Sequence, residues 1–193
     1  MRTFFHIILI FSSLSLGSCN FVKYILESPP PSKEENLKKS INQFVQNSLF
    51  NIEYQSLKLN PEVFKGEKIR VYGVIIDEFK DEFLLLTNPF EDNEFGFYRI
   101  KIDNPLPKQG DVPKPLKYIV RGSNINVLGY YIGLTDIDVQ KISENSRQLN
   151  PHINYSKLKQ IPSIEAVIIF DRDDIRFERP LWLSSKFIEK NYR

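Results

Sequence analysis

The chain has 193 residues, with 26 basic and 24 acidic side chains, and its net charge of +2 is close to neutral. A chain with so small a charge lacks the strong positive field that draws proteins onto nucleic acid, so nucleic acid is disfavoured as a partner. Aromatic residues make up 13% of the chain, a proportion that suits a packed β domain and argues against disorder.

The first 18 residues have the pattern of a secretory signal peptide. Arg2 is the only charged side chain before an apolar run from Phe4 to Leu16, and the small residues Gly17 and Ser18 follow. The run is too short to cross a bilayer comfortably, because a membrane span needs about 20 apolar residues. We therefore expect an exported protein that loses residues 1–18.

The residues around the predicted cleavage site add a second signal. Leu16-Gly17-Ser18-Cys19 resembles the lipobox of bacterial lipoproteins, in which leucine and two small residues precede an invariant cysteine. The resemblance implies a lipid on the Cys19 sulfur and an acyl chain such as palmitate on its amine. By resemblance to enterobacterial sorting, Asn20 favours the outer membrane over the inner. The alternative is an ordinary signal peptide, or a signal anchor, in which the cysteine is incidental.

The mature chain is expected to begin with a tether and a helix. Residues 19–32 form the predicted lipidated tether, which includes the stiff run Ser28-Pro29-Pro30-Pro31. Ser32 and Glu35 have capping-box spacing, which predicts a helix over residues 33–50. Apolar residues then recur at helical intervals, at Leu37, Ile41, Phe44, Val45, Leu49 and Ile52. The helix and its connection fill the predicted segment 33–60.

From residue 66 onward the apolar pattern becomes that of β-strands. Strands are predicted over residues 68–76, 83–87, 95–102, 125–132 and 164–170, with a proline-rich loop at 105–115. The polar stretch 135–160 allows either a short helix or a long loop. Residues 171–193 form a charged C-terminal extension whose apolar residues predict that part of it packs back onto the domain.

Three of these segments resemble strands of an OB-fold of the anticodon-binding-like type. They are residues 64–74, 122–130 and 161–169, which match the first, fourth and closing strands in their glycines and apolar alternation. The resemblance implies a mainly β fold with a five-stranded barrel over residues 61–170, preceded by the helix that exported OB-fold lipoproteins often have. Gly73 and Gly129 interrupt strands where a small barrel must bend.

Few side chains have a pattern that predicts catalysis or metal binding. After processing, His152 is the only histidine and no cysteine other than Cys19 exists, so neither a histidine-rich zinc site nor a thiolate metal site can form, and we expect His152 to be a loop histidine near Pro151. Asp171, Asp173 and Asp174 could hold a hard cation, or they could form a solvated turn. We expect no cofactor and no metal.

The most suggestive pattern for ligand binding lies on two predicted strands. Alternation places basic and aromatic side chains together on one face of each strand, at Lys68, Arg70, Tyr72, Phe95, Phe97, Arg99 and Lys101. If the two strands were neighbours, this face would resemble the surface on which OB-folds bind oligonucleotides and oligosaccharides. The alternative is that Phe95 and Phe97 pack beneath the helix or the C-terminal extension.

Two functional hypotheses follow from the sequence. The first is a non-catalytic binding module, anchored to the membrane through Cys19, that presents a barrel face to a protein, peptide or glycan of the cell envelope. The second is an envelope enzyme, such as a glycan hydrolase that uses two carboxylates at a fixed separation. No acidic residue stands in a recognisable catalytic context, so we favour the binding module.

Overall fold

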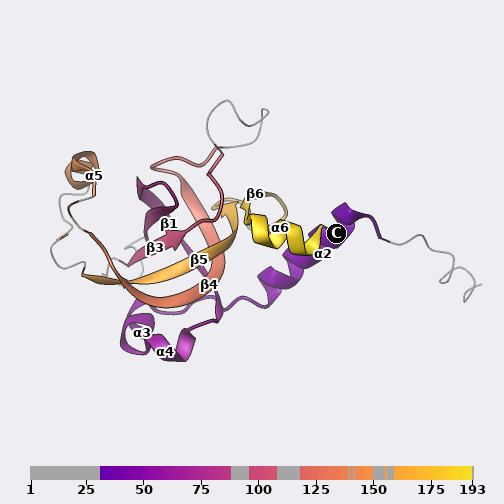
Figure 1. Cartoon of the computed structure of the whole chain (residues 1–193), viewed down its shortest axis with the longest axis horizontal. Coiled ribbons are helices and arrows are strands. Elements are labelled where there is room, and N and C mark those ends of the chain that lie inside the picture. The colour runs from indigo at the N-terminus through magenta and orange to yellow at the C-terminus, as the bar shows by residue number, and fades with distance from the viewer. Residues whose placement is uncertain are drawn as a thin grey trace, which may run out of the picture.

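The computed structural model describes residues 31–87, 96–107, 118–138, 142–149 and 159–192, together with Gln140 and Tyr155 (Figure 1). The predicted signal peptide, Cys19 and the tether up to residue 30 lie outside the described residues. The same is true of Phe95 and His152.

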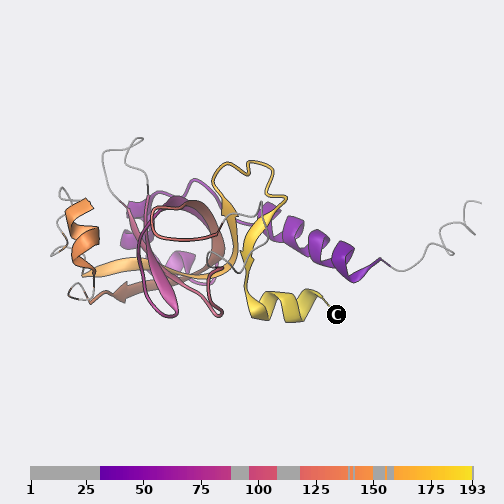
Figure 2. The same ribbon diagram turned by 90° about the horizontal axis from the view of Figure 1, so that it is seen from above.

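The fold is mainly β and is built on a closed five-stranded barrel. The described strands are β1 (Lys68–Glu78), β2 (Glu82–Leu86), β3 (Phe97–Lys101), β4 (Asn124–Asp136), β5 (Gln160–Asp171) and β6 (Pro180–Leu183). Their order is β3-β2-β1-β4-β5-β6, and β3 also pairs with β5 in parallel, which closes the barrel. The long strands β4 and β5 curve around it (Figures 1 and 2). The prediction of an OB-like barrel is confirmed.

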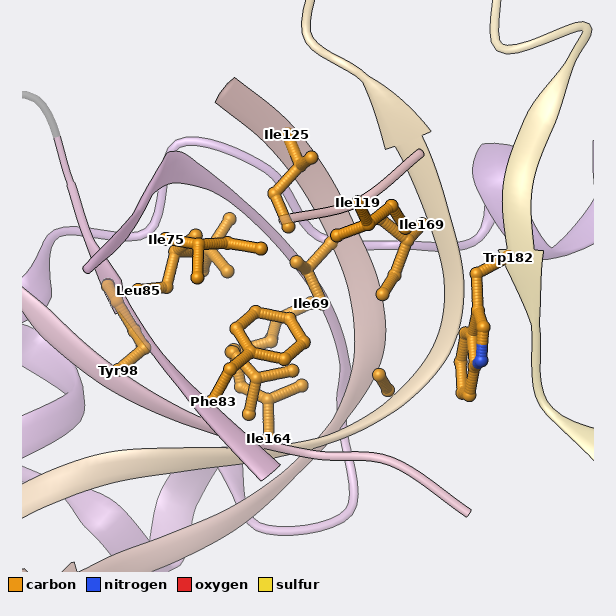
Figure 3. Close-up of a cluster of buried hydrophobic side chains, with 14 of the residues drawn as sticks. Ile69, Ile75, Phe83, Leu85, Tyr98, Ile119, Ile125, Ile164, Ile169 and Trp182 are labelled. Carbon is orange, nitrogen blue, oxygen red and sulfur yellow. The ribbon is translucent and has the colours of Figure 1, made fainter. Parts of the chain in front are cut away.

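The main core fills the inside of this barrel. Ile69, Val71 and Ile75 of β1 are buried there, as the alternation of the strand predicts, and so are Tyr98 and Ile100 of β3. Figure 3 shows Ile69, Ile75 and Tyr98 in this group of side chains, with Trp182 of β6 at its edge. The C-terminal extension therefore contributes both a strand and a core residue to the domain.

Short helices complete the fold, and one of them closes an end of the barrel. The helices are α2 (Lys33–Gln46), α3 (Tyr54–Leu59), α4 (Pro61–Phe64), α5 (Glu144–Leu149) and α6 (Ser185–Asn191). Leu57 of α3 is fully buried in the main core, and its carbonyl oxygen accepts a hydrogen bond of 2.9 Å from the Tyr131 hydroxyl. The burial of Leu57 and this hydrogen bond hold α3 against the barrel.

Helix α2 begins as predicted but ends earlier. Both hydrogen bonds of the capping box between Ser32 and Glu35 are present. The helix ends at Gln46 rather than at residue 50, because the next residues pair with β1. Leu49 donates its N–H to the carbonyl oxygen of Lys68 and accepts from the N–H of Arg70, at 2.7 and 2.8 Å. These bonds cover an edge of β1 that β2 does not reach.

Two glycines allow the barrel strands to approach each other. A Cβ atom at Gly129 would lie 2.2 Å from the carbonyl oxygen of Glu165, and one at Gly73 would lie 2.2 Å from that of Leu86. The pairing of β4 with β5 also shifts register between Leu128 and Gly129. Glycine is therefore required at both predicted bends because no side chain fits between the strands.

Two smaller apolar clusters cover the outside of the barrel. The first lies under α2 and α6, over β4 and β5, and comprises Ile41, Phe44, Leu128, Val167, Ile168 and Phe170. The second lies under the segment around α5, over β2 and β3, and comprises Ile76, Leu84, Leu86, Phe97, Ile142, Tyr155 and Ile161. Most of the outer barrel surface near these strands is thus unavailable to a ligand.

Candidate functional site

The predicted binding face of β1 is already occupied by contacts within the chain. Each of its side chains takes part in a cation–π contact: Lys68 with Phe44, Arg70 with Phe50 and Phe177, and Tyr72 with Arg172. The distances from the cation to the ring centroid are 5.0 to 5.7 Å. Such contacts hold the neighbouring segments against the strand.

The two halves of the predicted face do not adjoin. Strands β1 and β3 are separated by β2, which pairs with both of them, so the expectation that the two strands are neighbours is wrong. Across β2, Leu86 faces Val74 of β1 on one side and Phe97 of β3 on the other. The basic and aromatic residues of β1 and β3 therefore cannot form one continuous strip.

The β3 half of the predicted face does not form a binding surface. It contributes to a hydrophobic cluster and to an ion pair. Phe97 is only 4% exposed and packs in the cluster beneath the α5 segment, which corrects its assignment as a ligand contact. Arg99 Nε and Nη2 both lie 2.7 Å from Glu82 Oε2. Lys101 is half-buried and stands opposite Glu82 in the β2–β3 register.

The α5 segment is fastened over this face by hydrogen bonds. The buried carboxylate of Asp77 accepts a bond of 2.6 Å from the Ser143 N–H, and the Ser146 hydroxyl donates to the Ile76 carbonyl oxygen at 2.6 Å. The Tyr155 hydroxyl donates to the Ser146 carbonyl oxygen at 3.0 Å. The insert before β5 thus covers β2 and β3, the strands on which OB-folds commonly bind ligands.

A cleft on the other flank of the barrel is the best candidate site among the described residues. It lies between α2 and α6, over β4 and β5, and has a volume of about 370 Å³. Its lining combines aromatic, basic and amide side chains, including Gln43, Phe44, Lys68, Tyr130, Glu165, Lys186, Phe187, Lys190 and Asn191. Of the predicted contact residues that the structure describes, Lys68 alone lines this cleft.

Three aromatic rings form the apolar part of the cleft. Phe44 of α2 meets Tyr130 of β4 edge to face, at a centroid distance of 5.6 Å. It meets Phe187 of α6 in the same way at 5.9 Å. Edge-to-face pairs of this kind stabilise the packing beyond the area that they bury. Phe44 therefore joins both helices to the barrel, and Tyr130 presents the exposed ring of the three.

Charged side chains stand around the aromatic rings. Lys186 Nζ lies 2.8 Å from Glu165 Oε1, and this hydrogen bond and the adjacent negative charge raise the pKa of Lys186. Neither Lys68 nor Lys190 forms an ion pair with any described residue. Three ammonium groups and one carboxylate thus line the cleft, which gives it a positive character.

Asp103 fixes the helix that forms one wall of the cleft. Its Oδ2 accepts from the Ser184 hydroxyl at 2.7 Å and from the Lys186 N–H at 3.2 Å, while its Oδ1 accepts from the Ser185 N–H at 3.1 Å. Burial acts to raise the pKa of Asp103, but these hydrogen bonds outweigh it and hold the pKa below its ordinary value of 3.8. The charged carboxylate is therefore the form that holds α6 in place.

Replacing Asp103 by asparagine should weaken the pH dependence of stability in acid. Because the folded state lowers the pKa, the stabilisation from Asp103 is present above its unfolded pKa and is lost as the pH falls through the folded value. Urea unfolding of both proteins at about pH 7 and about pH 3 measures this. The variant should be less stable at the higher pH, and the difference between the two proteins should narrow at the lower. A constant difference would show that the carboxylate charge is not what holds α6.

The acidic residues that follow β5 serve the turn itself. Asp171 Oδ1 accepts from the Asp173 N–H at 3.0 Å, and Asp174 Oδ2 accepts from the Arg179 N–H at 2.9 Å. These bonds fit the solvated turn that the sequence allows. Across the described ranges, no three His, Cys, Asp or Glu side chains come together as a metal site.

The sequence matches no protein-family model, and a search of curated proteins found no relative. In the part of the chain that the structure describes, no helix has the length and apolar character needed to cross a bilayer.

Proposed function

We propose that this protein is a non-catalytic binding module of the cell envelope, anchored in the membrane by lipid on Cys19, and that it binds its partner in the cleft between α2 and α6. The observation that carries the proposal is the combination of exposed Tyr130 with Lys68, Lys186 and Lys190 around one concavity. A protein, peptide or glycan of the cell envelope would be the partner expected at this location.

The dimensions and lining of the cleft support a binding role. Ligand sites are concave, typically about 300–1,000 Å³, and combine apolar walls with a few polar groups. The cleft has a volume of about 370 Å³ and combines aromatic rings with amide and ammonium groups. Its walls come from two helices and the barrel, so its shape depends on the folded domain as a whole.

The alternative of a glycan hydrolase receives less support from the same cleft. Such an enzyme needs two carboxyl groups facing each other across the substrate. Glu165 is the one carboxylate among the described residues that line the cleft, and its Oε1 is bound to Lys186. We therefore keep the binding module as the proposal.

The direction of α2 supports anchoring at the helical side of the domain. Figure 1 shows that the chain enters α2 at the end of the helix that points away from the barrel. A lipid on Cys19 would reach the domain through this end, so α2 and α6 would lie between the membrane and the barrel. The partner in the cleft would then be bound near the membrane surface.

Replacing Cys19 by alanine should abolish lipid attachment and leave the signal peptide on the chain. The lipid is attached through the cysteine sulfur, so the variant offers no site for it and should not be cleaved by the lipoprotein peptidase. Metabolic labelling with a radioactive fatty acid measures the first effect, and the size of the protein on a denaturing gel measures the second. A Ser18→Ala variant keeps the cysteine and a small residue before it, and should still be labelled. Label retained by Cys19→Ala would overturn the anchor.

Filling the cleft with a large side chain should abolish partner binding. Gln43 is exposed on α2 and lines the cleft, whereas Gln46 is exposed on the same helix and does not line it. The chain from residue 19, with Cys19→Ser, is used to capture partners from detergent-solubilised envelope. Gln43→Trp should lose the captured partner and Gln46→Trp should keep it, with similar melting temperatures. Equal capture by both variants would place the binding surface elsewhere.

A further inference from the structure

The charges of the cleft point to the kind of group that it binds. Lys186 is largely compensated by Glu165, but Lys68 and Lys190 have no carboxylate partner among the described residues. Lys190 is exposed, and the Lys68 ammonium lies 5.2 Å from the centre of the Phe44 ring, inside the cleft. Uncompensated positive charge in a concavity concentrates anions there. The cleft therefore selects for a negatively charged partner.

The aromatic rings distinguish between classes of anionic partner. A sugar ring would need a broad exposed aromatic face on which to stack. Phe44 offers none, because it is 5% exposed and already contacts Tyr130, Phe187 and the Lys68 ammonium. Tyr130 alone is substantially exposed, at 37%. One ring suits an apolar side chain better than it suits a chain of sugars.

The remaining polar groups match a polypeptide backbone. The amides of Gln43 and Asn47 and the hydroxyl of Ser40 follow one another along α2 on the wall of the cleft, and Asn191 stands on the wall made by α6. An amide side chain both donates and accepts hydrogen bonds, as each peptide unit does. Lysine ammonium groups bind carboxylates as point charges and tolerate varied geometry, which suits aspartate and glutamate side chains on a flexible peptide.

We infer that the cleft between α2 and α6 binds an acidic peptide segment of an envelope protein. This inference rests on the proposed function and specifies its partner. The acidic side chains pair with Lys68, Lys186 and Lys190, while an adjacent apolar side chain contacts Tyr130 and Phe187. The peptide lies in the cleft between the two helices, which meet through Phe44 and Phe187.

The test uses defined probes rather than an extract. The chain from residue 19, with Cys19→Ser, is applied to an array of dodecapeptides in which acidic, basic, neutral polar and apolar residues occur equally at every position. A glycan array that includes anionic oligosaccharides is probed in parallel. Affinities for the best peptide are then measured by fluorescence anisotropy. The peptides retained should be enriched in Asp and Glu next to an apolar residue.

A matched pair of double variants assigns the binding to the cleft. Lys186→Ala combined with Lys190→Ala should weaken binding of the acidic peptide by about ten-fold or more, because it removes two of the three ammonium groups. Lys38→Ala combined with Lys39→Ala removes the same charge from exposed positions of α2 that do not line the cleft, and should change binding much less. All four lysines are exposed, so both variants should melt close to the parent.

The outcomes separate the inference from the proposed function. Acidic enrichment that depends on Lys186 and Lys190 supports the inference. Retention of neutral peptides or of glycans, blocked by Gln43→Trp, would overturn the inference and leave the binding function standing. Acidic peptides bound equally by both lysine variants would show a nonspecific charge effect and would also overturn it. If neither array retains the protein, the inference fails, and the envelope capture with Gln43→Trp and Gln46→Trp decides whether the proposed function stands.

Discussion

Replacing Phe97 by alanine should lower the free energy of unfolding by about 3 to 5 kcal/mol. The ring is buried between β3 and the α5 segment, against Leu86, Ile142 and Ile161. Truncation would leave a cavity, and β2 and β3 cannot shift to fill it because they are fixed in the barrel. Urea unfolding followed by tryptophan fluorescence would report the change, since Trp182 lies in the main core.

Phe50 provides the matched control for this measurement. It is 60% exposed and contacts the Arg70 guanidinium at 5.1 Å, so Phe50→Ala removes a surface cation–π contact worth about 0.5 to 1 kcal/mol. The ratio between the two variants tests whether Phe97 is core. If Phe97→Ala instead kept its stability and lost its partner, the β3 face would be a binding surface, and the α5 segment would have to move away from it.

The barrel could be predicted from the sequence because its signals are local. Alternation in residues 68–76 places Ile69, Val71 and Ile75 inside, and all three are buried. The capping box at Ser32 and Glu35 and the glycines at positions 73 and 129 likewise depend on short-range patterns. Such patterns specify which residues face inward and where a strand must bend, whatever covers the outside of the barrel.

The outer surface could not be predicted in the same way, because distant segments cover it. When β3 is considered alone, Phe97 has the position of an aromatic residue on the surface. In the folded chain it is buried by Ile142, from the segment before β5, and by Ile161 of β5. One signal of this was present in the sequence. Phe97 and Tyr98 face opposite sides of β3, so an apolar residue on each face indicates a strand that is buried on both sides.

The candidate cleft could not be predicted from the sequence, for a related reason. Its lining combines α2, β4, β5 and α6, from Ser40 at one end of the sequence to Asn191 at the other. No local pattern places Lys190 beside Lys68. The apolar residues of the charged C-terminal extension did predict that this extension packs back, and Phe187 is the residue that contacts α2. Which part of the domain the extension packs against can be seen only in the folded chain.

Replacing Gly129 by alanine should destabilise the barrel by about 3 kcal/mol or more, because the strand would have to move. The added Cβ would lie 2.2 Å from the carbonyl oxygen of Glu165 and 2.7 Å from Cγ2 of Ile164. The overlapping oxygen belongs to the backbone of β5, and Glu165 pairs with both β3 and β4. Relief of the overlap would therefore separate β4 from β5 and disturb β5 where it also pairs with β3 to close the barrel.

Gly66→Ala separates this overlap from the cost of backbone strain. Gly66 has a φ of +86°, yet a Cβ atom there would meet no heavy atom within 4 Å. Its replacement should cost about 1 to 2 kcal/mol, from the left-handed conformation alone. Urea unfolding should rank Gly129→Ala well below Gly66→Ala in stability. Gly129→Ala should also lose partner binding, because Glu165 and Tyr130 line the cleft beside Gly129. Equal stability of the two variants would mean that β4 and β5 accommodate the added Cβ atom at no greater cost than the strain at Gly66, and it would contradict the requirement for glycine at position 129.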